Sequence, residues 1–303
     1  DDDTTKAPAP ATAVATAADF PAAAGKNLEQ LVAKYAPGPV LAPSVSAIEP
    51  GRTNRIAFAA FDIEHRQVRG AQIAVYLLDG KLRNAKGPFV AKPVSLDVDA
   101  QYRSRQTASD LNANDAIYVA EIPVPKAGKY AIAGIAKLQG KTLATSQFAI
   151  VAGKRGGPPD IGDPAPAVDT PTVTDASGDL SKIDTRVPPL PELHRQSAAD
   201  VIGKKPLVLL FATPQLCSSR VCGPVNDTTF QVSAQPQNKG VVFIHQEIYN
   251  DNEIDHGFRP QVRRYALPTE PWAFIIDRRG IIRDRLEGPF GAAELQAAVD
   301  KIR

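Results

Sequence analysis

The sequence predicts two domains of different class, an all-β sandwich followed by an α/β domain. A chain of 303 residues is longer than one ordinary hydrophobic core accommodates. Its first half carries short runs in which apolar and polar residues alternate, which is the period of a half-buried strand. Its second half carries continuous apolar runs separated by helical patterns, as in sheets covered by helices.

Composition and charge restrict the classes of partner. With 43% hydrophobic and 22% charged residues, the chain has the composition of a globular protein. Its net charge is +2, and basic and acidic residues are interspersed. We therefore expect no nucleic-acid partner and no basic membrane-surface patch. No apolar run approaches the roughly 18 residues of a membrane-spanning helix.

The opening segment, DDDTTKAPAPATAVATAADFPAAAGK, is rich in Ala, Thr and Pro, and the chain contains no methionine. We expect the numbering to begin after a signal peptide has been removed, with a lipid-bearing cysteine as a possible anchor upstream of Asp1. Residues 1–39 are expected to form a disordered tether and a short helix. The predicted location is extracytoplasmic, either secreted or tethered at the cell surface as a lipoprotein of the cell envelope.

A short helix is expected over residues 27–35. Asn27 is a good N-cap, and Gln30 three residues later completes a capping box. Leu28, Leu31 and Tyr35 share one face of this helix.

Residues 40–152 are expected to form the β-sandwich. Turn-forming residues separate most of its alternating runs, which favours an antiparallel arrangement. The architecture resembles an immunoglobulin-like sandwich, but this half has no cysteine and so lacks the disulfide between the two sheets. The runs are RIAFAAFDI, AQIAVYLLD, AIYVAEIPV, KYAIAGIAKL and TLATSQFAIVA.

A stretch dense in Gly and Pro, residues 153–162, is expected to be the linker to an α/β domain over 163–303. The elements of this domain follow in the order β, α, β, α, β, β, α. They are expected as strand 206–212, a helix starting at Pro224, strand 240–249, helix 259–267, strand 272–277, strand 281–288 and helix 291–302.

Several motifs of the second half resemble the thioredoxin superfamily, nearest to extracytoplasmic TlpA-like and peroxiredoxin-like members. They are GDPAP at 162–166, LFATPQLC at 210–217, CGPV at 222–225 and LPTEPWAFIIDRRGII at 267–282. The resemblance implies a cis-proline at Pro271 that faces the cysteines and flanks the backbone of a bound substrate. It covers about residues 160–303 and none of the sandwich.

The two cysteines depart from the family pattern. Thioredoxins carry C-x-x-C, whereas Cys217 and Cys222 are five residues apart and Val225 stands at the second cysteine position. On one unbroken helix this spacing gives a rise of about 7.5 Å, too far for a disulfide. If the helix starts at Pro224, the cysteines lie in the loop that enters it, and a Cys217–Cys222 disulfide becomes feasible.

We expect Cys222 to be the attacking thiol, because the positive end of a helix stabilises a thiolate and lowers its pKa. Cys217 is then the resolving partner. The alternative interpretation is a structural disulfide, the commonest use of two nearby cysteines in an exported protein.

His245 and Glu247 are two residues apart on an expected strand and therefore share a face. The carboxyl ends of strands form the functional edge of open α/β sheets, so we expect this pair near the cysteines, where it tunes proton transfer. The same placement suggests an alternative metal site made of Cys217, Cys222 and His245, as in Sco-type copper chaperones. His194 and His256 are expected to be solvated or locally bonded.

The sequence thus supports three hypotheses of different class. The first is thiol–disulfide exchange through Cys217, Cys222, Pro271, His245 and Glu247, acting on extracytoplasmic protein thiols or with a membrane redox partner, without a cofactor. The second is a non-catalytic cell-surface binding module with a structural disulfide. The third is a Sco-like copper-binding protein. The fold alone does not decide whether the cysteine pair is catalytic.

Overall fold

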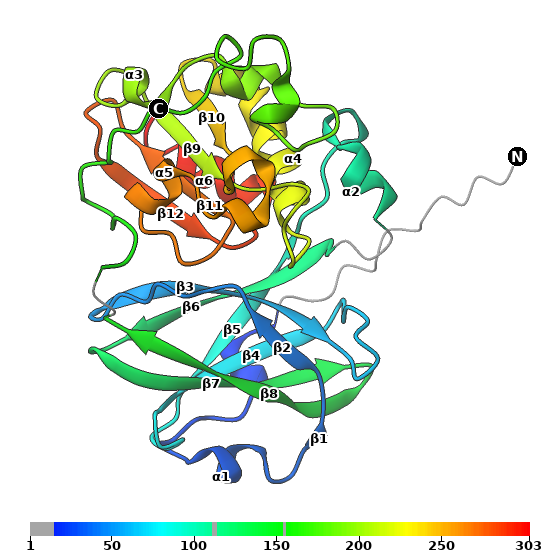
Figure 1. The fold of residues 1–303 in the computed structure, drawn as a ribbon. Helices are drawn as coiled ribbons and strands as arrows, with labels where there is room; N and C mark the ends of the chain where they lie inside the picture. The colour runs from blue at the N-terminus through cyan, green and yellow to red at the C-terminus, as the bar shows by residue number, and fades with distance from the viewer. Residues whose placement is uncertain (1–14, 111–113, 154–155) are drawn as a thin grey trace, which may run out of the picture. The chain divides into compact units, whose positions relative to one another are not determined.

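A computed structural model describes residues 15–110, 114–153 and 156–303 of the chain (Figure 1). The chain divides into two compact units. Within the described residues, the first contains 15–43, 49–93 and 118–152, and the second contains 44–48, 94–117 and 153–303. The range expected for the sandwich, 40–152, is thus interrupted by two segments that belong to the second unit.

The first unit is built on eight strands in the order β1-β8-β7-β4-β5-β6-β3-β2. Neighbouring strands pair antiparallel wherever their register is defined, except that β1 pairs with β8 in parallel. Figure 1 shows β3 and β6 in one layer and β7 and β8 in another. The Phe58 ring contacts Tyr118 and Phe148, so aromatic side chains fill the space between these layers. The strands are β1 Ala36–Pro37, β2 Val40–Pro43, β3 Arg52–Phe61, β4 Gln72–Asp79, β5 Lys86–Ser95, β6 Ala116–Val124, β7 Gly128–Leu138 and β8 Lys141–Ala152.

The segment before the sandwich is more ordered than expected. Residues 1–14 of the predicted tether lie outside the described residues, but Phe20 and Ala23 are buried against side chains of β4 and β7. The Tyr76 hydroxyl donates a 2.7 Å hydrogen bond to the carbonyl of Pro21. The prediction of disorder for residues 15–26 was therefore wrong, because one large apolar side chain anchors an otherwise small-residue segment.

Helix α1 (Leu28–Val32) confirms the capping box. The Asn27 side chain accepts from the backbone N–H of Gln30, and the Gln30 side chain accepts from the backbone N–H of Asn27. Two N–H groups that the first turn leaves without helical partners are satisfied in this way.

The second unit contains a four-stranded sheet in the order β10-β9-β11-β12. Strands β9 and β10 are parallel, and β11 is antiparallel to both β9 and β12. The element order is the one expected from the sequence. The principal elements are β9 Leu207–Phe211, α4 Cys222–Ser233, β10 Val242–Gln246, α5 Pro260–Arg264, β11 Trp272–Ile276, β12 Ile282–Glu287 and α6 Ala292–Val299.

Both faces of this sheet are covered. Val208 and Leu210 of β9 pack in a core with side chains of α4 and α6. Leu207, Leu209 and Phe211 face the other way, into a core with α3 (Ala198–Val201) and α5. Alternate residues of β9 thus enter different cores, which explains why this strand reads as a continuous apolar run.

The segment between β5 and β6 packs on α4 of the second unit. It contains α2 (Arg105–Ser109) and a short 3-10 turn, Ala100–Tyr102. The backbone N–H of Ser104 donates to the Asp227 carboxylate (2.9 Å), and Arg186 pairs with the same carboxylate (2.9 Å). This segment interrupts the sandwich in the sequence, but in the structure it packs against α4 of the second unit.

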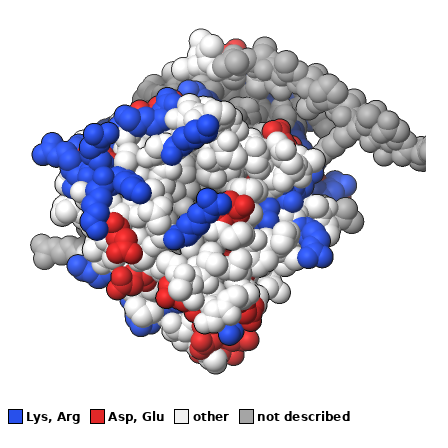
Figure 2. Space-filling model, turned by 90° about the horizontal axis from the view of Figure 1, so that it is seen from above, with Lys and Arg blue, Asp and Glu red and all other residues white. Residues whose placement is uncertain are grey.

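The end of the predicted linker is also fixed in the second unit. The N–H of Gly162 donates to the carbonyl of Ile282, and the N–H of Ala165 donates to that of Gly280. On the molecular face in Figure 2, Lys and Arg side chains gather at the upper left and Asp and Glu at the lower left and bottom, with further charged side chains scattered over the rest of the face. Among the described residues, no helix is long and apolar enough to cross a membrane.

Candidate functional site

The two cysteines meet at the start of helix α4. Cys217 lies in the loop that leaves β9, and Cys222 is the first residue of the helix. Both thiols are free, and they contact each other through a hydrogen bond. The expected Cys217–Cys222 disulfide is not formed in the structure. Both sulfurs are buried, Cys222 completely.

Cys217 is the acidic thiol of the pair. Its hydrogen bond with the Cys222 thiol, opposed by burial, lowers the pKa of Cys217 to about 6. The Ser219 hydroxyl lies 3.2 Å from the sulfur, and the backbone N–H groups of Cys222 and Val221 contribute further hydrogen bonds. These N–H groups belong to the first turn of α4, where they have no partner within the helix. Cys217 thus occupies the positive end of the helix.

Cys222 is the opposite case. Burial raises its pKa well above the ordinary thiol value, and the neighbouring Cys217 raises it further. These pKa directions run against the prediction that Cys222 is the more acidic thiol. The helix begins at Cys222 and not at Pro224, so the Cys222 side chain points into the core while the first-turn N–H groups point out of the helix end.

Glu270 is a member of this site that sequence reasoning did not select. Burial raises the pKa of its carboxyl to about 7, and the negative charge of Cys217 adds to this effect. Pro271 follows it, and the Glu270–Pro271 bond is cis, which confirms the expectation for this position. The sequence signal for Glu270 was its position directly before Pro271, the proline expected to face the cysteines.

One residue, Thr213, separates Glu247 from Cys222. Its carboxylate accepts from the backbone N–H and the hydroxyl of Thr185, both at 2.7 Å, and burial raises its pKa to about 7. The hydroxyl of Thr213 lies beside this carboxyl, and the backbone N–H of Thr213 donates to the sulfur of Cys222. Thr213 therefore lies between Glu247 and the buried thiol.

His245 lies in a different cluster. Its Nε2 is 2.9 Å from the carbonyl oxygen of Ala212, and its Nδ1 is 3.5 Å from Asp184. The ring packs edge-on against His194. Of the two alternatives expected for His194, solvated or locally bonded, burial excludes the first. His256 is exposed and pairs with Asp251.

This placement corrects the alternative metal site. Both ring nitrogens of His245 are directed to Asp184 and Ala212, so Cys217, Cys222 and His245 do not form a ligand set. In the part of the chain that the structure describes, one group of three or more His, Cys, Asp or Glu side chains has its ligand atoms within 4.8 Å of one another, and it consists of Asp184, His194 and His245.

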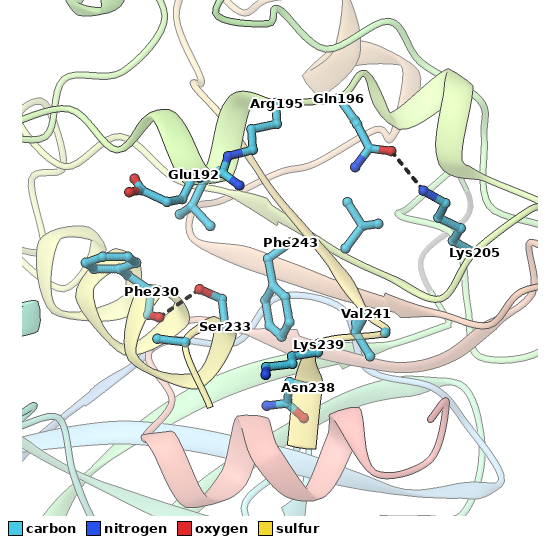
Figure 3. Close-up of a pocket in the computed structure, with 14 residues that line it drawn as sticks. Glu192, Arg195, Gln196, Lys205, Phe230, Ser233, Asn238, Lys239, Val241 and Phe243 are labelled. Atoms are coloured by element: carbon cyan, nitrogen blue, oxygen red, sulfur yellow. Dashed lines mark hydrogen bonds between the residues drawn. The ribbon is translucent and has the colours of Figure 1, made fainter. Parts of the chain in front are cut away.

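A pocket of about 510 Å³ lies on another part of the second unit (Figure 3). Phe230, at the end of α4, and Phe243 of β10 form apolar walls, and Glu192 and Lys205 stand on its rim. Neither cysteine lines it. The geometry therefore separates this pocket from the thiol pair.

Comparison with known proteins gives only partial likenesses of fold. No family model and no curated protein matches the chain. A solved thiol:disulfide interchange protein of the thioredoxin family from Chlorobium tepidum TLS is similar, with 16% identity and a TM-score of 0.31 over 47% of this chain and 97% of that one. The BTLA ectodomain is similar with 10% identity and a TM-score of 0.21, over 37% of this chain and 98% of that one.

A protein of the DUF4784 family from Bacteroides caccae ATCC 43185 is similar at 10% identity and a TM-score of 0.21, over 42% of this chain and 27% of that one. These scores are too low to assign a function. The function is therefore argued from the residues of the site.

Proposed function

We propose that this protein carries out thiol–disulfide exchange with Cys217 as the attacking thiol and Cys222 as the resolving thiol. The observation that carries the proposal is the difference in acidity between two thiols in contact, with the pKa of Cys217 lowered to about 6 and that of Cys222 raised by burial. At neutral pH, Cys217 is then a thiolate, which is the nucleophilic form. The roles are the reverse of those expected from the sequence.

The reaction balances within the pair. The Cys217 thiolate attacks one sulfur of a substrate disulfide, forms a mixed disulfide and releases one substrate thiolate. Cys222 then attacks the Cys217 sulfur, which forms the Cys217–Cys222 disulfide and releases the second substrate thiolate. The substrate gains two electrons and the protein loses two, and the reverse sequence oxidises a dithiol.

The mixed disulfide makes Cys222 easier to ionise. In the reduced pair, the hydrogen bond and the charge of Cys217 both raise the pKa of Cys222. Both effects end when Cys217 becomes part of a disulfide, because its sulfur then carries no charge. Glu247, next to Thr213, is the group proposed to accept the Cys222 proton, whereas His245 is directed to Asp184.

Glu270 and Pro271 are proposed to border the substrate. The Glu270 carboxyl is close enough to Cys217 to respond to its charge, and burial raises its pKa to about 7, which suits proton exchange with a leaving thiolate. The partners proposed from the sequence are extracytoplasmic protein thiols or a membrane redox protein, met at or outside the cell surface.

The reduction potential tests the proposal. We would equilibrate the full chain with glutathione buffers of defined potential, block free thiols by alkylation and measure the Cys217–Cys222 midpoint by mass spectrometry. A midpoint between about −120 and −270 mV is expected for an exchange-active pair. A midpoint below about −300 mV would assign the pair a structural role.

Serine variants separate the two roles. With a model disulfide substrate, Cys222→Ser is expected to accumulate a mixed disulfide at Cys217, because the resolving thiol is missing. Cys217→Ser is expected to form no adduct, since the remaining thiol is buried and protonated. An adduct at Cys222 in Cys217→Ser, with none at Cys217 in Cys222→Ser, would restore the roles expected from the sequence.

Burial of both sulfurs favours a second candidate, a non-catalytic binding module in which the cysteines only brace the start of α4. This candidate predicts that neither thiol reacts with the substrate in the folded chain. The glutathione titration decides between the two, because a structural pair is not reduced and reoxidised at exchange-active potentials.

A further inference from the structure

A second cluster of reactive side chains lies apart from the thiol pair. Asp184 comes from the loop after the 3-10 turn Leu180–Lys182, His194 ends the 3-10 turn Pro191–His194, and His245 belongs to β10. The Asp184 carboxylate is 3.4 Å from Nε2 of His194 and 3.5 Å from Nδ1 of His245. All three side chains are buried.

Hydrogen bonding fixes the protonation of His245. Its Nε2 is 2.9 Å from the carbonyl oxygen of Ala212, which can only accept, so Nε2 carries the hydrogen. In the neutral ring, Nδ1 therefore presents a lone pair, and it has no hydrogen-bond partner.

Two backbone N–H groups hold the Asp184 carboxylate in place. One oxygen accepts from the N–H of Arg186 (2.9 Å) and the other from that of Leu190 (2.8 Å). A carboxylate oxygen faces the lone pair of His245 across 3.5 Å, which is repulsive unless a proton or a metal ion lies between them.

His194 offers a further donor. Both of its ring nitrogens are buried without a hydrogen-bond partner. Buried polar atoms without a partner are uncommon and costly in a folded protein, so these nitrogens require an explanation. A bound cation would take one nitrogen from each of the two imidazole rings.

We propose that Asp184, His194 and His245 bind a divalent transition-metal ion of the Zn²⁺ class. Two imidazole nitrogens and a carboxylate oxygen are ligands that Zn²⁺ prefers, whereas Mg²⁺ and Ca²⁺ prefer oxygen alone. Ligand atoms around a tetrahedral Zn²⁺ with bonds of 2.0–2.1 Å are roughly 3.3 Å apart. Nε2 of His194 lies 3.4 Å from one oxygen of Asp184 and Nδ1 of His245 lies 3.5 Å from the other. One ligand atom from each of the three residues lies within 4.8 Å of the other two.

Backbone contacts give the site the outer support that metal ligands usually have. His245 is oriented by Ala212 and Asp184 by two N–H groups, as outer-shell contacts orient ligands in known metal sites. The site does not use Cys217 or Cys222, so the proposal is independent of thiol exchange.

Calorimetry on the full chain, stripped with a chelator and kept reduced, tests the proposal. We expect one Zn²⁺ per chain with a Kd below about 1 μM, and no competition from 1 mM Mg²⁺. The Cys217→Ser/Cys222→Ser double variant should bind equally well. Absence of micromolar binding, or its loss in the double variant, would overturn the site.

Matched histidine variants locate the ion. His194→Gln is expected to weaken Zn²⁺ binding at least 100-fold, since even outer-shell contacts are worth about 10- to 100-fold. His256→Gln, which alters an exposed His–Asp pair, should leave binding unchanged. X-ray absorption of the Zn²⁺-loaded wild-type protein gives a test that does not depend on the folding of a variant. We expect a shell of N and O atoms at about 2.0–2.1 Å from the ion. Sulfur at about 2.3 Å would contradict the proposal.

Discussion

At the scale of single residues, the reactivity of the thiol pair depends on which sulfur the helix end faces. Cys217 receives hydrogen bonds from the Cys222 thiol, Ser219 and two backbone N–H groups, while Cys222 is enclosed by apolar side chains. The pKa of Cys217 is therefore lowered and that of Cys222 raised, although the two residues are only five positions apart. The difference lets one thiol attack while the other stays protonated until it is needed.

Ser219→Ala is expected to raise the pKa of Cys217 from about 6 toward the ordinary thiol value, by roughly one unit. The Ser219 hydroxyl is 3.2 Å from the sulfur, and a hydrogen bond to a charged group is worth about 1.5–3 kcal/mol before solvent exposure weakens it. The pH dependence of Cys217 alkylation, followed by mass spectrometry, measures the change. Ser218→Ala is the matched control, because Ser218 is exposed and adjacent. An equal pKa of Cys217 in the two variants would mean that the Ser219 hydroxyl does not stabilise the thiolate.

The sequence predicted the members of the thiol site better than their roles. Cys217 and Cys222 lie together and the Glu270–Pro271 bond is cis, as the family resemblance implied, but the pKa directions of the two thiols are the reverse of the expectation. The error came from the start of the helix. Proline needs no N–H partner anywhere in the first turn, so Pro224 fits the third helical position as well as the first. No local pattern distinguishes these positions, and a shift of two residues moves Cys222 from the loop into the core.

At the scale of elements, α4 is held by side chains remote in sequence. Asp227 of α4 accepts from Ser104 and pairs with Arg186, and Gly223 lies where an added Cβ would be 3.0 Å from the Thr107 hydroxyl. A glycine at this position lets α2 approach the first turn of α4. These contacts fix the helix end that acidifies Cys217.

Asp227→Asn is expected to lower the free energy of unfolding by about 2 to 4 kcal/mol, because it leaves the buried Arg186 guanidinium without its counter-charge. Burial already raises the pKa of Asp227, so the loss comes chiefly from Arg186 and not from the carboxylate. Urea denaturation measures the change.

Lys301→Ala is the control for Asp227→Asn, since its pair with Asp284 is partly exposed and worth at most about 1 kcal/mol. Similar losses in both variants would show that the Asp227 pair behaves like a surface ion pair.

At the scale of the whole molecule, the order of the elements was predictable from the sequence, but the unit to which each segment belongs was not. Alternation in the first half and continuous apolar runs in the second reflect local burial, which the sequence records directly. The attachment of residues 94–117 to the second unit depends on Ser104 and Asp227, which are 123 positions apart. The same holds for Asp184, His194 and His245, which come from three segments and carry no spacing motif.

The buried Glu247 is expected to make the stability of the folded chain fall as pH rises from about 4.5 to about 7. Burial raises its pKa from 4.5 to about 7, so in this range the folded chain keeps a proton that the unfolded chain has released. Unfolding then releases protons, and the free energy of unfolding decreases with pH. The total loss is on the order of 3 kcal/mol.

Glu247→Gln removes this titration while keeping an acceptor for Thr185. Relative to wild type, its free energy of unfolding should therefore rise between pH 4.5 and 7 and level off above pH 7. Urea denaturation of both proteins at a series of pH values measures the difference, in which other titrating groups, such as Asp184 at low pH, cancel. Glu192→Gln is the control, because the Glu192 side chain is exposed. A difference that does not change with pH would mean that the pKa of Glu247 is not raised in the folded chain, and its carboxylate would then be too weak a base to take the Cys222 proton.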